Sequence, residues 1–171
     1  MIVFLASDVM LFASVFAAYF LLRTEVSPWP PADVELETAR AVIATVVLVS
    51  SSGSMIAAER AYERRDMAGL RRWTLVTMAL GGVFLVNQIA EYQMLEFGFD
   101  SHAYGSVYWM LTGIHTAHVA AGIGVLGMLL VRGARARHEA SIEPWVAATA
   151  AFWHMIDVIW VAVFVTIWVV R

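Results

Sequence analysis

The chain has 171 residues, 61% of them hydrophobic, and its mean hydropathy of +0.73 is far above that of a soluble domain, in which about half of the residues are apolar. The net charge of -3 is small and indicates no nucleic-acid partner. Cys is absent, which excludes disulfides, thiolate metal ligands and iron–sulfur clusters. Because of the high hydropathy, we expect a polytopic membrane protein.

Five apolar stretches follow one another along the chain, each long enough to cross a bilayer as one helix. We expect transmembrane spans over residues 2–22, 38–58, 73–95, 106–131 and 146–170. Pro28, Pro30 and Pro31 disfavour helix between the first two spans, and Pro144 suits the first turn of the last helix. The sequence therefore predicts an all-α fold, with five transmembrane helices bundled in one domain.

Arginine is distributed unevenly among the connections between these spans. Eight of the eleven Arg lie in the connections 59–72 and 132–143, which we expect to be loops, whereas the connections after the first and third spans are mainly acidic. The positive-inside rule then predicts a cytoplasmic N-terminus and an external C-terminus. The same arginines are candidates for binding anionic lipid headgroups, and a role in topology alone is an equally good interpretation. The candidates are Arg60, Arg64, Arg65, Arg71, Arg72, Arg132, Arg135 and Arg137.

Six carboxylate and histidine side chains lie within the predicted spans, where an unpartnered charge is costly. His154 and Asp157 are three residues apart and therefore share one face of the last helix. We expect a buried polar network that ties the helices together. Its candidate members are Asp8, Glu91, His115, His118, His154 and Asp157, with His115 and Glu91 nearer the outside.

Each of these residues also has a simpler interpretation. Asp8 would be a helix-end carboxylate if the first helix began later, and Glu91 would be solvated if it lay at the membrane surface. His115 and His118 have the spacing of a metal-binding pair but need a third ligand, and His118 with His154 would suit the axial ligands of a haem. The hydrogen-bonded network is favoured over both, so we expect no metal site.

The chain contains little that indicates catalysis. It has no Gly-rich phosphate loop, no thiol nucleophile and no evident serine triad. Carboxylates and histidines inside membrane spans can also mark a proton path, which makes a small proton-coupled transporter the alternative from another class. Five spans contain no inverted repeat, and no proline breaks a span at mid-depth, as many transporters require.

Four short motifs occur in order along four of the five spans. They are Ala6–Phe12, Gln88–Tyr92, Thr112–Val119 preceded by Tyr104–Ser106, and Trp153–Trp160. In order and spacing they resemble subunit III of haem-copper cytochrome c oxidases along essentially the whole chain. Asp8 stands where the family usually has a buried Glu, and Thr116 stands where Gly is usual. The longer family form has seven helices, and this chain resembles the last five, as in short bacterial versions.

The resemblance implies a non-catalytic subunit of an oxidase complex, with no haem or copper of its own. Such a subunit packs beside catalytic subunit I in a bacterial plasma membrane, binds phospholipid, and supports complex stability and proton uptake during aerobic electron transport. Haem and copper would lie in partner subunits, and other oxidase or supercomplex subunits would be further partners. A quinol oxidase subunit III, or the similar accessory protein of a nitric oxide reductase, is the alternative within this class.

Overall fold

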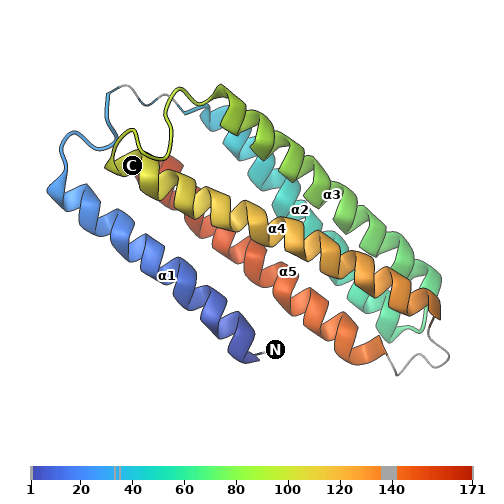
Figure 1. Cartoon of the computed structure of the whole chain (residues 1–171). Coiled ribbons are helices and arrows are strands. Elements are labelled where there is room, and N and C mark those ends of the chain that lie inside the picture. Colours follow the sequence, from blue (N-terminus) through green and yellow to red (C-terminus); the bar gives the residue numbers. More distant parts are fainter. Residues whose placement is uncertain (1, 33, 35, 136–141, 171) are drawn as a thin grey trace.

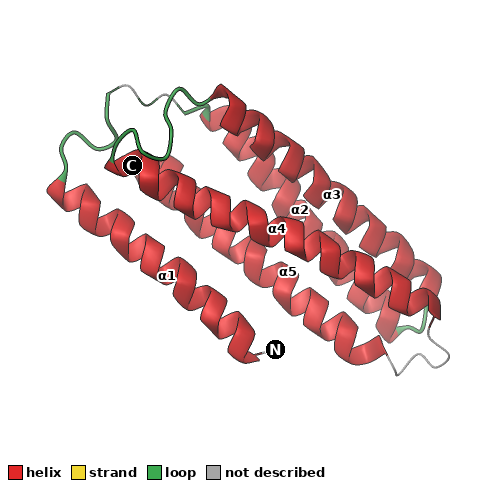
Figure 2. Cartoon of the chain, viewed as in Figure 1, coloured by secondary structure: helices red, strands yellow, loops and turns green. Residues whose placement is uncertain are grey.

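The computed structural model describes residues 2–32, 34, 36–135 and 142–170, and these residues form helices and loops but no strands (Figures 1 and 2). The helices are α1 (Ile2–Glu25), α2 (Thr38–Glu63), α3 (Met67–Met94), α4 (Ala103–Arg135) and α5 (Glu143–Phe164), which continues as the π-helix η2 (Val165–Val170). All five are long and apolar enough to cross a membrane. The prediction of an all-α protein with five such helices is confirmed.

The helices extend beyond the predicted apolar spans at the Arg-rich end of the bundle. α2 continues to Glu63 and α3 already begins at Met67, so the loop predicted over residues 59–72 is wrong and the turn has only three residues. α4 likewise continues through Arg135, into the loop predicted over residues 132–143. Hydropathy falls where the hydrocarbon layer ends, whereas the backbone hydrogen bonds of a helix persist into the headgroup region.

The tight turn between α2 and α3 is set by three residues. Arg65 adopts a left-handed backbone conformation, with φ of 59°, which reverses the chain after α2. Asp66 then caps α3, because its carboxylate accepts a hydrogen bond from the backbone N–H of Gly69 at 2.8 Å. A Cβ at Gly69 would lie 2.3 Å from that carboxylate, so any larger residue there would displace the Asp66 side chain from its present position.

The helices run alternately up and down, so the start of α1 and the end of α5 lie at opposite ends of the bundle (Figure 1). α2 and α3 form the closest pair, while α5 contacts α1, α2 and α4. α1 lies at the edge of the bundle and packs against α4 and α5 (Figure 1). Tyr19 of α1 donates a hydrogen bond to the carbonyl of Thr166 in η2, at 3.2 Å, and so ties this edge helix to the end of α5.

Trp153 of α5 lies at the centre of the core and is 1% exposed. Its indole packs against two glycines of neighbouring helices. A Cβ at Gly81 of α3 would lie 2.7 Å from the ring, and one at Gly122 of α4 would lie 2.9 Å from it. Its N–H donates a hydrogen bond to Ser51 of α2 at 2.9 Å. One side chain therefore contacts three helices, with its single polar group satisfied.

The stretch of small residues in α2, residues 50–54, directs part of its hydroxyl groups to the interior, whereas Ser50 is exposed. Ser51 and Ser54 are buried, and the hydroxyl of Ser54 lies 2.7 Å from that of Thr77 in α3. Gly53 has open space beside its Cα. The close approach of α2 to α3 therefore involves small polar side chains, as is common between membrane helices.

We predict that Gly122→Val lowers the stability of the bundle by about 1–3 kcal/mol, because the indole of Trp153 is enclosed and overpacking forces strained rotamers. The thermal unfolding midpoint of the protein purified in mild detergent measures this effect. Gly124→Val is the matched control on the same helix, because nothing lies within 4 Å of a Cβ there. Equal midpoints for the two variants would contradict this interpretation.

Candidate functional site

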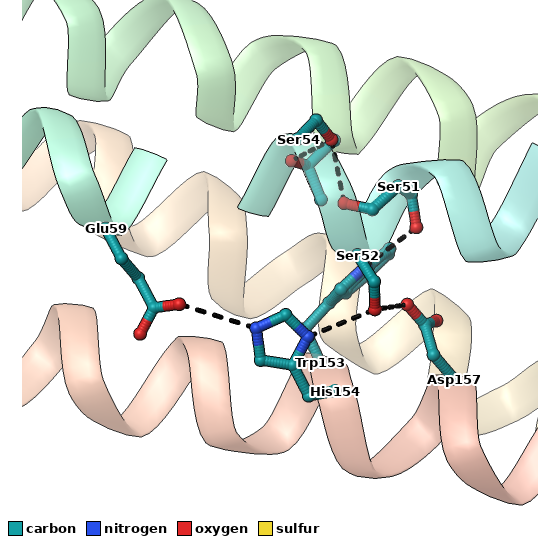
Figure 3. Close-up of polar contacts among 8 residues, drawn as sticks. Ser51, Ser52, Ser54, Glu59, Trp153, His154 and Asp157 are labelled. Carbon is teal, nitrogen blue, oxygen red and sulfur yellow. Dashed lines mark hydrogen bonds and ion pairs between the residues drawn. The ribbon is translucent and has the colours of Figure 1, made fainter. Parts of the chain in front are cut away.

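A chain of four polar side chains joins α2 to α5 and is called here the α2–α5 polar chain: Glu59, His154, Ser52 and Asp157 (Figure 3). Nε2 of His154 lies 3.4 Å from Oε2 of Glu59, and Nδ1 lies 3.0 Å from the hydroxyl of Ser52. That hydroxyl donates a hydrogen bond to Oδ2 of Asp157. His154 and Asp157 are therefore brought together through a residue of another helix.

The helical repeat explains why these four residues meet. Ser52 and Glu59 are seven residues apart on α2, which is two turns, and therefore share one face. His154 and Asp157 share one face of the antiparallel helix α5. Glu59 and Ser52 are about 10 Å apart along the axis of α2, and their side chains reach the two nitrogens of the His154 imidazole, which lies between them.

Asp8 of α1 and His118 of α4 form a second contact between helices. Oδ1 of Asp8 lies 3.6 Å from Nε2 of His118, and both side chains are largely buried. Nδ1 of His118 lies 2.8 Å from the backbone carbonyl of Ile114, and a carbonyl only accepts, so Nδ1 carries a proton. Nε2 is thereby directed at Asp8, and the pair links the edge helix α1 to the bundle.

Glu91 of α3 is buried and pairs with Arg40 of α2, which also contacts Glu37. Arg40 lies 3.7 Å from each of the two carboxylates and also donates to the sulfur of Met94. A cavity of about 260 Å³ adjoins Glu37 and Glu91 at this end of the bundle. The side chain of Glu91 is thus largely buried near the end of α3, and the Arg40 cation of α2 offsets part of the cost of that burial.

His115 is 0% exposed and lies among aromatic rings. Its ring centroid is 4.8 Å from that of Trp160 and 5.7 Å from that of Phe84. Neither ring nitrogen has a hydrogen-bond partner among residues 2–32, 34, 36–135 and 142–170. His115 and His118 thus have different surroundings, and within those residues no three His, Cys, Asp or Glu side chains are grouped to hold a metal ion.

The six predicted network residues therefore occupy several separate environments. Asp8 contacts His118, His154 reaches Asp157 through Ser52, Glu91 contacts Arg40, and His115 packs among rings. The partners Ser52, Glu59 and Arg40 were not predicted from the sequence. The seven-residue spacing of Ser52 and Glu59 would have placed both on one helix face, but the predicted span ended at residue 58 and so left Glu59 outside the helix.

The arginines proposed as lipid ligands lie near one end of the bundle, around the turn between α2 and α3 and the end of α4 (Figure 1). Arg71 and Arg72 line a largely apolar groove of about 810 Å³ between α3 and α4. The guanidinium of Arg132 stacks 3.8 Å from the ring centroid of Trp145. Arg60, Arg64, Arg65 and Arg135 are exposed, and Arg137 lies outside the described residues.

The chain is similar to known proteins over nearly its whole length. The family model described as Cytochrome c oxidase subunit III matches residues 1–170. Cytochrome c oxidase subunit 3 of Thermostichus vulcanus is 35% identical, over 99% of this chain and 85% of its own length. Probable cytochrome c oxidase subunit 3 of Mycobacterium tuberculosis is 37% identical, over 99% and 86%. Cytochrome c oxidase subunit 3 of Synechocystis is 32% identical, over 98% of this chain and 72% of its own length.

We predict that Asp8→Leu lowers the stability of the protein by about 1–3 kcal/mol, because Nε2 of His118 loses its buried partner. Asp8→Asn should cost much less, since the amide keeps a polar group facing Nε2 of His118. Thermal unfolding midpoints in mild detergent measure both effects. Ser7→Ala is the control, because that exposed hydroxyl bonds only to the carbonyl of Phe4 in its own helix. A midpoint for Asp8→Leu equal to that of the control would refute the pairing.

Proposed function

Since the chain belongs to the cytochrome c oxidase subunit III family, we propose that it is a subunit of a respiratory haem-copper terminal oxidase that packs beside catalytic subunit I. The observation that carries this proposal is the family match to residues 1–170, which includes all five helices and every buried ionisable side chain described above. Its contribution would be to the stability of the complex and to proton uptake during aerobic electron transport.

The outward faces of the helices fit a place among lipids and other subunits. The chain is a multi-pass membrane protein, and large apolar side chains are exposed on all five helices. Examples are Val3 of α1, Val46 of α2, Val86 of α3, Met128 of α4 and Val158 of α5. We propose a bacterial plasma membrane as its location, with the Arg-rich end of the bundle in the cytoplasm, which the charge distribution supports.

We propose that the redox centres lie in partner subunits and that this chain has a structural role. Two of the histidines considered as metal ligands contact polar groups, His118 with Asp8 and His154 with Glu59 and Ser52, and the third, His115, is enclosed by aromatic rings. This use of the imidazoles supports a subunit that carries no haem or copper itself. The identity of the electron donor, cytochrome c or quinol, would be set by other subunits.

We further propose that the groove between α3 and α4 binds an anionic phospholipid. Its lining is mostly apolar, as acyl chains require, and includes Leu70, Leu75 and Leu129. Arg71 and Arg72 line the same groove near the membrane surface and can meet a phosphate headgroup.

We predict that the double variant Arg71→Gln with Arg72→Gln loses anionic phospholipid that otherwise co-purifies with the protein. Native mass spectrometry of the complex in mild detergent measures the bound lipid. Arg64→Gln with Arg65→Gln is the matched control, because these exposed arginines lie in the nearby turn and do not line the groove. Equal lipid retention by both double variants would contradict the proposed site.

The function is tested by purifying the complex through a tag on this chain in mild detergent. We expect a large, many-span subunit to co-purify, with the absorption bands of haem and with oxygen-reducing activity. The haem type and any copper-binding partner would then identify the electron donor. A chain that purifies alone after chemical cross-linking in the membrane, or one that binds haem by itself, would contradict the proposal.

A further inference from the structure

We propose that the α2–α5 polar chain is a proton relay through which the buried carboxyl group of Asp157 exchanges protons with water at the Arg-rich end of the bundle. The four side chains form a continuous series from Glu59 to Asp157 (Figure 3). The inference rests on this geometry and does not depend on which oxidase the chain joins.

The two ends of the relay differ in burial and in depth along the bundle. The side chain of Glu59 is 34% exposed, and Glu59 lies one turn before the end of α2, about 6 Å along the axis. Asp157 is 4% exposed and lies about 21 Å from the start of α5, near the middle of that span. Glu59 therefore lies nearer than Asp157 to the aqueous phase at the Arg-rich end of the bundle.

The hydrogen bonds allow one proton to be passed along the four side chains, because His154 and Ser52 each gain one proton and give up another. In the first arrangement Glu59 is protonated and donates to Nε2 of His154, whose Nδ1–H donates to Ser52, whose hydroxyl donates to ionised Asp157. Glu59 then gives its proton to Nε2, Nδ1 gives its proton to Ser52, and Ser52 gives its proton to Asp157. Glu59 ends ionised and Asp157 neutral, and every hydrogen bond has reversed its direction.

The other polar groups near Asp157 are engaged with partners outside the α2–α5 polar chain. Ser51, the other hydroxyl beside Asp157 on α2, accepts from Trp153 and donates to the carbonyl of Leu48. Of the ionisable groups that α1 and α4 place within the membrane-spanning core near this depth, Asp8 and His118 face each other, and His115 is enclosed by the rings of Phe84 and Trp160. α3 contributes the hydroxyl of Thr77, which bonds to Ser54.

The consequence is a movable charge inside a subunit that has no redox centre of its own. Each transfer along the relay moves a negative charge from Asp157, in the middle of the bundle, to Glu59 near its end, and a proton taken up from water has then neutralised Asp157. The chain can thus store a proton at mid-depth and return it to the same side of the membrane. A static set of hydrogen bonds between α2 and α5 would not exchange protons in this way.

Infrared difference spectroscopy after a rapid pH jump tests the relay in the complex with which the chain purifies. The carboxyl C=O band that disappears in Asp157→Asn identifies Asp157. We expect Ser52→Ala to slow the protonation of this band by about 100-fold, since positioned proton-transfer groups contribute factors of that size. Ser52→Thr keeps a hydroxyl group and should restore the rate. Glu59→Gln, which cannot release a proton, should also slow it.

Two matched controls separate the relay from general damage to α2. Ser50→Ala removes an exposed hydroxyl that bonds to the carbonyl of Val46, and Glu63→Gln neutralises an exposed carboxylate at the end of the same helix. Both should leave the rate unchanged. A wild-type rate in Ser52→Ala or in Glu59→Gln would overturn the relay, as would the absence of an Asp157 carboxyl band at any pH. If Ser52→Ala does not assemble, Glu59→Gln decides.

Discussion

The indole of Trp153 is the contact on which the bundle depends. Its ring fills the space beside Gly81 of α3 and Gly122 of α4, and its N–H is satisfied by Ser51 of α2. Because lipid tails are as apolar as the side chains, membrane helices associate through close packing and interhelical hydrogen bonds rather than through the hydrophobic effect. A ring held on three sides also fixes the rotation of α5, which directs the next residue, His154, towards α2.

The buried carboxylates of α1, α3 and α5 each meet a polar partner from another helix. The pairs are Asp8 with His118, Glu91 with Arg40, and Asp157 with Ser52. Such pairs add little net stability, because desolvation offsets most of the attraction, but breaking one leaves the remaining group buried and unpaired. They therefore specify which helices are neighbours, while the glycines and small polar residues provide the close packing.

The number of helices was predictable because each apolar run matches the thickness of a bilayer. The helix ends were not predictable, because α2 continues through the charged residues Glu59 and Glu63, beyond the point where the apolar run ends. The buried ionisable residues were recognisable from their cost in lipid, but their partners depend on which helices adjoin, and a single sequence does not contain that information. His115 illustrates the limit, since its spacing from His118 predicted a shared network and the structure surrounds it with aromatic rings.

A subunit of the cytochrome c oxidase subunit III family thus owes its arrangement to one packed indole and to the polar contacts around it. The most direct test is a double-mutant cycle that combines Gly122→Ala with Trp153→Phe and measures thermal unfolding of the purified complex. The account predicts that Gly122→Ala is destabilising when Trp153 is present and nearly neutral with phenylalanine at position 153, because the smaller ring leaves room for the methyl group. An equal cost of Gly122→Ala in both backgrounds would contradict it.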